Sequence, residues 1–209
     1  MFTRTFAIVF AAACFLAMFA GAADEPAVKS GPKVGDDLPG PFHPYNVTGK
    51  RAGDFHDVVS EQGLDPVVLV LVHNWDFTKK VDDQVPLVQL LQRLDPMAGK
   101  DAKVRIAVAA VFLNDDLKDV VKNDDLRKKY AESVETFKTD AKLNNIVLGL
   151  DNADGPKGYA LNADAEVTVL VCNRLKVDAN YEFLKDGLKN ENADAIVAAV
   201  KEKLGGAKK

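Results

Sequence analysis

The sequence predicts an α/β domain built as a three-layer sandwich, with a mixed central sheet, a C-terminal β-hairpin and helices on both faces. Two continuous apolar runs, residues 67–73 and 104–114, are typical of strands buried on both faces. Each run is followed by helical spacing, which predicts parallel strands joined by right-handed crossovers. Two further strand patterns, 166–173 and 174–183, meet at Asn173-Arg174 and predict the closing antiparallel hairpin.

Residues 1–22 have the build of a secretory signal peptide. Arg4 precedes an apolar run from Phe6 to Phe19, and the small residues Ala20-Gly21-Ala22 offer a cleavage point. The run of about 14 residues is shorter than the roughly 20 that span a bilayer as a helix. We therefore expect an exported protein, periplasmic or secreted. A retained anchor and lipid attachment at Cys14 remain open alternatives.

The rest of the chain divides into a leader and one domain. Residues 23–40 are rich in Pro, Gly, Lys and Asp, so we expect a flexible leader there. Residues 41–209 are long enough for one domain with a substantial core. The whole chain has a formal net charge of −4, with charges of both signs interspersed and no basic patch. This pattern argues against a nucleic-acid partner and, after signal cleavage, against a membrane partner.

The first half of the domain begins with extended chain. Three prolines between residues 39 and 44 exclude a helix there, and residues 47–49 suit a short hairpin. After the strand at 67–73, apolar residues recur with helical spacing from Val81 to Leu91. We expect this helix to begin near Thr78 and to kink at Pro86, which lacks a backbone N–H.

The second half alternates helices and strands before the hairpin. Asn114 and Asn123 are good N-cap residues, which predicts one short helix through residue 121 and a longer one after residue 123. Residues 145–151 predict a third strand. The final helix is predicted from Asn192 to Leu204, where two glycines follow.

Three stretches, in this order and spacing, carry a family resemblance. They are "VGDDLPGPFHPYNVTGK", "VVLVLVHNWDFTKKVDDQVPLVQLL" and "AEVTVLVCNRLKVDANYEF". Together they resemble the entry segment, the strand with active-site turn and helix, and the closing hairpin of the thioredoxin fold. The resemblance covers roughly residues 34–204 and is to exported bacterial proteins of the thioredoxin-like and peroxiredoxin-like group.

The resemblance also shows where this chain departs from the family. Counting back from Pro86, the family's CxxC motif falls on Thr78-Lys79-Lys80-Val81. The threonine hydroxyl cannot replace a thiolate in disulfide exchange or peroxide reduction, and the valine cannot resolve a mixed disulfide. The family's cis-proline position falls on Glu166, or at most on Val167. The resemblance therefore implies a thioredoxin-like domain that is redox-inactive.

Cys172 is the one cysteine that remains if the signal peptide carries Cys14 away. A single thiol excludes an internal disulfide and a cysteine-based zinc site. Cys172 lies six residues along a strand from Glu166, which is roughly 20 Å from the substrate end of the sheet. We expect a packed, buried thiol. Thiol-dependent redox chemistry through Cys172 is the alternative.

The turn after the first buried strand is the candidate binding site, because ligands of open α/β sheets bind at the carboxyl ends of strands. Its candidate residues are His73, Trp75, Asp76, Phe77, Thr78 and Glu166. We expect no catalytic residue, cofactor or metal, and a binding or structural role toward an unidentified protein or peptide partner. A non-redox enzyme that uses His73 and Asp76 is the remaining alternative.

Overall fold

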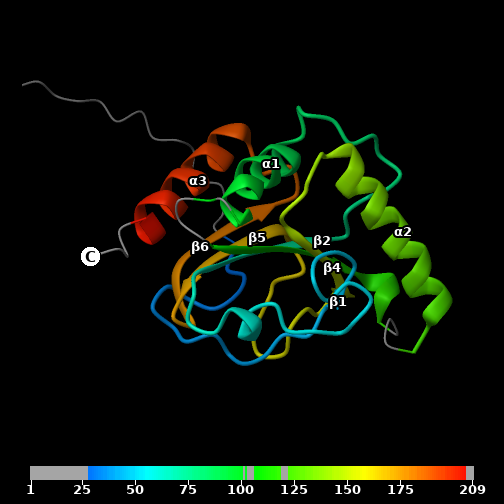
Figure 1. Cartoon of the computed structure of the whole chain (residues 1–209), viewed down its shortest axis with the longest axis horizontal. Helices are drawn as coiled ribbons and strands as arrows, with labels where there is room; N and C mark the ends of the chain where they lie inside the picture. The colour runs from blue at the N-terminus through cyan, green and yellow to red at the C-terminus, as the bar shows by residue number, and fades with distance from the viewer. Residues whose placement is uncertain (1–27, 101, 103–105, 119–121, 206–209) are drawn as a thin grey trace, which may run out of the picture.

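The computed structural model describes residues 28–100, 102, 106–118 and 122–205 (Figure 1). The predicted signal peptide, its cleavage point and Cys14 lie outside these residues. The boundary at residue 22 therefore stays a prediction.

A mixed sheet of six strands forms the centre of the domain, in the order β1-β4-β3-β2-β5-β6 (Figure 1). The strands are β1 (Tyr45–Asn46), β2 (Val67–His73), β3 (Ala107–Asn114), β4 (Val147–Asn152), β5 (Ala165–Asn173) and β6 (Lys176–Leu184). β2, β3 and β4 are parallel, whereas β1, β5 and β6 run antiparallel to their neighbours. This confirms the predicted α/β fold with a mixed sheet and a closing hairpin.

The hairpin between β5 and β6 turns at Arg174 and Leu175. Both residues have positive φ angles, of 51° and 62°. Two successive residues in this region form the type I′ geometry whose twist matches that of the flanking strands. The predicted hairpin is therefore present, with its two-residue turn one position later than the sequence pattern indicated.

All three α-helices pack on the same face of the sheet. They are α1 (Pro86–Ala98), α2 (Asp124–Asp140) and α3 (Asn190–Gly205). Buried residues of each helix, including Leu91, Phe137 and Ile196, join one core cluster with Val68, Val70 and Val72 of β2. Figure 1 shows the three helices together on one side of the strands. The prediction of helices on both faces is therefore wrong for the described α-helices, which all cover one face.

Extended chain covers the other face. Phe42, Val59 and Tyr159 pack there against the alternate side chains of β2, such as Leu69 and Leu71. The helical part of this layer, within the described chain, is the short 3₁₀ helix η1 (Ser60–Gln62). A layer of loops satisfies the same physical need as a helix, because it removes the apolar face of the sheet from water.

The described part of the leader, from residue 28, is packed rather than flexible. The hydroxyl groups of Ser30 and Thr168 lie 2.8 Å apart in a buried hydrogen bond. Further along, the N–H of Gly31 donates to the carbonyl of Ala160, and the N–H of Leu38 donates to the carbonyl of Leu175. These contacts correct the expectation of a mobile leader to residue 40. Composition could not predict them, because most are made by the backbone.

α1 begins at Pro86, eight residues after the predicted start. Pro86 occupies the first turn, where its missing N–H costs no hydrogen bond, so it starts the helix instead of kinking it. Val81 and Val85 lie before the helix, yet both pack against the helix-side core. The apolar residues before Pro86 thus belong to a loop that packs on the core and happens to keep helical spacing. This is why the start of the helix was predicted eight residues too early.

The two asparagine caps are confirmed. The side chain of Asn114 accepts from the N–H of Asp116 at 2.8 Å and starts the short 3₁₀ helix η2 (Asp115–Leu117). The side chain of Asn123 accepts from the N–H of Leu126 at 2.9 Å and starts α2. The predicted continuation of the short helix reaches residue 121, which lies outside the described residues.

A buried carboxylate in α1 holds the entry to β4. Asp95 is 7% exposed and accepts four hydrogen bonds from one short segment. Its oxygens accept hydrogen bonds from the main-chain N–H groups of Asn144, Asn145 and Ile146 at 2.9, 2.8 and 3.1 Å. They also accept one from the side-chain amide of Asn145 at 2.8 Å. The carboxylate thus satisfies the buried N–H of Ile146 and three partly buried donors of the same segment. Asp95 therefore fixes where β4 begins.

Candidate functional site

A pocket of about 210 Å³ lies at the carboxyl end of β2. Three segments form it: the turn leading into α1, the start of β5 and the segment before α3. Its lining residues are Trp75, Lys79, Lys80, Val85, Pro86, Leu87, Glu166, Val167, Asp186 and Leu188. The pocket contains Lys79 and Lys80, the two middle positions at which the family resemblance places the CxxC motif, and Glu166 and Val167, at which it places the cis-proline.

Aromatic packing holds the turn in place. The ring of Phe77 stacks edge-on against Phe112, Tyr130 and Phe137, with centroid distances of 5.0, 6.3 and 6.5 Å. Trp75 packs edge-on against Phe137 at 5.6 Å and lines the pocket. Its indole N–H is buried and has no hydrogen-bond partner among the described residues. Phe77 is thus an anchor of the turn, and Trp75 is the aromatic residue that faces the pocket.

His73 ties the end of β2 to two neighbouring segments. It is 5% exposed, and its Nδ1 lies 2.7 Å from the carbonyl oxygen of Ala165, while its Nε2 lies 3.1 Å from that of Ala153. Both ring nitrogens therefore face main-chain carbonyl groups. This geometry leaves no ring nitrogen to pair with Asp76 as a catalytic base.

Asp76 and Thr78 form a local turn instead of a helix cap. The main-chain N–H and the hydroxyl of Thr78 both donate to Oδ1 of Asp76, at 3.0 and 2.6 Å. The hydroxyl bond, followed by the N–H bond, holds the pKa of Asp76 below its usual value. Because α1 starts at Pro86, the expectation that Thr78 caps this helix is wrong. A thiol placed there would lack the helix-terminal donors that acidify a redox cysteine.

Glu166 closes the pocket on the side of β5. Its Oε2 accepts from the main-chain N–H of Asp186 at 2.7 Å, which joins the strand to the segment before α3. Lys79 and Lys80, on the turn, are the basic residues of the same lining. The pocket thus combines an apolar interior with a rim of both charges.

The structure brings together two of the predicted site residues, Trp75 and Glu166, in this pocket. Asp76, Phe77 and Thr78 line a neighbouring hollow with Trp75, and His73 lies beneath the surface. Sequence reasoning missed the contribution of Asp186 and Leu188. The segment that carries them has no motif, and only the fold brings it next to the turn.

Cys172 lies far from the pocket. It pairs with Val67 at the amino end of β2, whereas the pocket lies beyond His73 at the carboxyl end. Six residues of strand correspond to roughly 20 Å. The thiol also belongs to the core cluster on the loop-covered face and is 2% exposed. Burial, with a smaller effect from Asp178, raises the pKa of Cys172 to about 12. The expected buried thiol is confirmed.

Two further searches concern the described residues alone. No group of three or more His, Cys, Asp or Glu side chains among them is placed to hold a metal ion. None of the helices within these ranges is long and apolar enough to cross a membrane.

Comparison with solved structures identifies the fold. A putative thiol:disulfide interchange protein DsbE from Chlorobium tepidum matches with a TM-score of 0.53 and 18% identity, over 83% of this chain and 99% of that one. An uncharacterized conserved protein from Geobacillus kaustophilus matches with a TM-score of 0.52 and 18% identity, over 88% and 91%. BsSco, a member of the Sco family of cytochrome c oxidase assembly proteins, matches with a TM-score of 0.51 and 10% identity, over 86% and 100%.

No protein-family model and no curated protein sequence matches the chain. The structural similarities establish a thioredoxin-like fold, as the resemblance implied. At 10–18% identity they do not transfer the chemistry of these proteins to this chain.

Proposed function

We propose that this protein is an exported, redox-inactive thioredoxin-like domain that binds a peptide segment of a partner protein. One observation carries the proposal. The pocket at the substrate end of the sheet is present, but neither its lining nor the turn between β2 and α1 contains a cysteine, and Cys172 is buried at the other end. The pocket is therefore suited to binding without thiol exchange.

The size and lining of the pocket favour a peptide side chain as the occupant. Its volume of about 210 Å³ lies below the roughly 300–1,000 Å³ that is usual for sites of small molecules. Val85, Pro86 and Leu188 offer apolar contacts. An apolar side chain of a peptide segment satisfies this lining. Lys79 and Lys80 favour an acidic residue beside it.

Export rests on the signal-peptide pattern of residues 1–22. Two of the structural neighbours are, by name, a putative thiol:disulfide interchange protein and a member of a family of assembly proteins. An exported domain without a thiol in its pocket would bind a peptide segment of a partner without oxidising or reducing it.

The binding test uses Trp75 as its own reporter, since it is the single tryptophan of the chain. A phage-displayed library of random 12-residue peptides is selected on the protein, and enriched peptides are synthesised and titrated while Trp75 fluorescence is followed. We expect saturable changes in fluorescence. The double variant Lys79→Ala/Lys80→Ala should weaken binding at least about fivefold, since loss of rim charges costs on the order of 1 kcal/mol.

The matched control is Lys201→Ala/Lys203→Ala, which removes two exposed lysines from α3, away from the pocket lining. This variant should bind like the unchanged protein. Equal weakening by both double variants, or enriched peptides that leave Trp75 fluorescence unchanged, would contradict the proposed site.

A further inference from the structure

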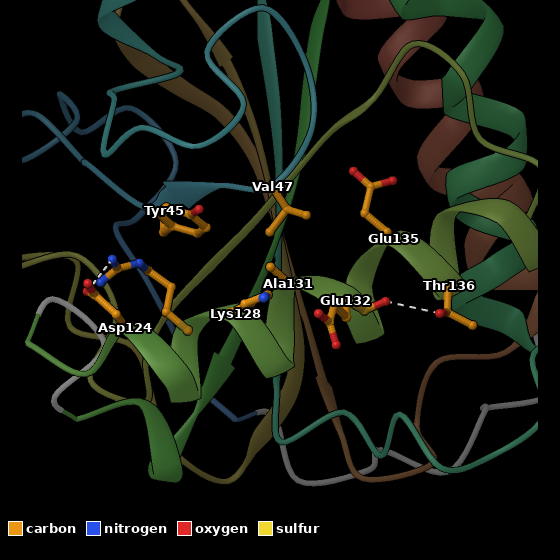
Figure 2. Close-up of a pocket in the computed structure, with 9 residues that line it drawn as sticks. Tyr45, Val47, Asp124, Lys128, Ala131, Glu132, Glu135 and Thr136 are labelled. Atoms are coloured by element: carbon orange, nitrogen blue, oxygen red, sulfur yellow. Dashed lines mark hydrogen bonds and ion pairs between the residues drawn. The ribbon is translucent and has the colours of Figure 1, made fainter.

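A second hollow, of about 730 Å³, lies between α2 and the β1 edge of the sheet (Figure 2). We call it the α2 groove. It is lined by Tyr45, Val47, Asp124, Arg127, Lys128, Ala131, Glu132, Glu135 and Thr136. Figure 2 shows the α2 side chains along one wall and Tyr45 and Val47 on the other. Tyr45, Val47 and Ala131 are its apolar residues, and five of the nine lining residues are charged.

A stripe of residues on α2 has a charge order that would be complementary to the same stripe on a second, antiparallel α2 helix. Asp124, Lys128, Ala131, Glu135 and Lys138 are spaced by four, three, four and three residues, so they form one stripe along the helix. The first four line the groove, and Lys138 continues the stripe beyond it. Their charges are negative, positive, neutral, negative and positive. When this order is aligned with its own reverse, each acidic residue lies opposite a basic one, and Ala131 lies opposite Ala131 at the centre.

The wall of the groove is held in place by Arg127. Its guanidinium lies 5.1 Å from the ring centroid of Tyr45 and 5.6 Å from that of Phe55, and it also bonds Asp124. Within the stripe, Nζ of Lys138 lies 3.7 Å from Oε2 of Glu135. Such exposed pairs along one helix contribute little to stability, so the stripe can face a partner at small cost.

We propose that the α2 groove is an interface between two copies of this chain. The two α2 helices pack antiparallel about a two-fold axis at Ala131, where the small side chain allows close approach. Lys128 then faces Glu135 of the second copy, and Asp124 faces Lys138 of the second copy. An isologous contact requires this self-complementarity, because the same patch must meet itself. Charge complementarity is the observation that selects a second copy as the occupant.

This inference is independent of the proposed peptide pocket. The groove lies at the β1 edge, whereas the pocket lies between the ends of β2 and β5, three strands away in the sheet. The dimer therefore presents two separate pockets. Bivalent presentation raises the apparent affinity for a partner that carries two binding segments.

Sedimentation velocity of the protein recovered from cells tests the interface. We expect a concentration-dependent dimer whose dissociation constant rises when salt is raised from about 20 to 500 mM, since exposed charges are screened. Lys128→Glu should raise the dissociation constant at least about tenfold, because two like-charge contacts replace two attractive ones. Lys128→Glu/Glu135→Lys should return it to within about threefold of the original value.

Lys129→Glu is the matched control, since it makes the same charge change one residue away and off the stripe. It should leave the dimer unchanged, and far-UV circular dichroism should be the same for all variants. A monomer at every concentration up to about 1 mM, where affinity falls below roughly 4 kcal/mol, would overturn the proposal. So would a dimer that Lys128→Glu does not weaken, or one that the double exchange does not restore.

Discussion

Alkylation of Cys172 is expected to be at least about a thousandfold slower in the native protein than in the unfolded chain at pH 8. The thiol is 2% exposed, and burial raises its pKa to about 12. At pH 8 such a group is thiolate in only about one molecule in 10⁴, whereas an unperturbed thiol of pKa about 8.5 is roughly one-quarter thiolate. The thiolate is the nucleophile, so the rate falls in proportion.

Peptide-level mass spectrometry after timed exposure to iodoacetamide measures this ratio, because it separates Cys172 from any remaining Cys14. The unfolded reference is the same protein in about 6 M guanidinium chloride, well above typical unfolding midpoints. A native rate within tenfold of the unfolded one would mean that the thiol is accessible. Redox chemistry through Cys172 would then replace the binding role as the better explanation.

Asp95→Ala is expected to lower the free energy of unfolding by about 3 kcal/mol. The carboxylate accepts three main-chain N–H bonds and one amide bond from the segment 144–146. Alanine leaves these donors without an acceptor; the N–H of Ile146 is buried and the other donors are partly buried. A buried unsatisfied donor costs about 1–3 kcal/mol unless water reaches it. Because the segment leads into β4, the loss should also loosen the contact between β4 and β1.

Urea unfolding followed by circular dichroism measures the change. Asp140→Ala removes an exposed carboxylate from the end of α2 and should change stability by less than about 0.5 kcal/mol. Asp95→Asn retains one acceptor oxygen, so its loss of stability should lie between those of Asp140→Ala and Asp95→Ala. A loss below about 1 kcal/mol for Asp95→Ala would mean that Asp95 does not organise the start of β4.

The sheet could be predicted because its signals are local and strong. The apolar run at 67–73 is short and rich in valine, which favours a buried strand over a helix. Asn114 and Asn123 act through hydrogen bonds within three residues of themselves. The turn at Arg174-Leu175 is equally local. Each of these features depends on neighbours in sequence, which is why the pattern and the structure agree.

The helix layer and the leader depended on contacts that the sequence pattern does not encode. Pro86 fits both the interior of a kinked helix and a first turn, and Val81 keeps helical spacing while it packs from a loop. Ser30 meets Thr168 across 138 residues of chain. Backbone and long-range contacts of this kind leave no periodic signal.

The candidate site could be placed but not completed from the sequence. The rule that ligands bind at the carboxyl ends of strands pointed to the turn after β2, and Trp75 of this turn lines the pocket. It could not show that His73 faces the carbonyl groups of Ala153 and Ala165, since carbonyl groups are present at every residue. Nor could it add Asp186, which joins the site through its main-chain N–H.

The absence of thiol chemistry is the central claim, and an insulin-reduction assay with dithiothreitol as electron donor tests it most directly. The account predicts precipitation of the insulin B chain at the rate of the control without protein, for both the unchanged chain and Cys172→Ser. The reason is that neither the turn between β2 and α1 nor the pocket lining contains a cysteine, and Cys172 is buried far from the pocket. A rate clearly above that control in either protein would contradict the account.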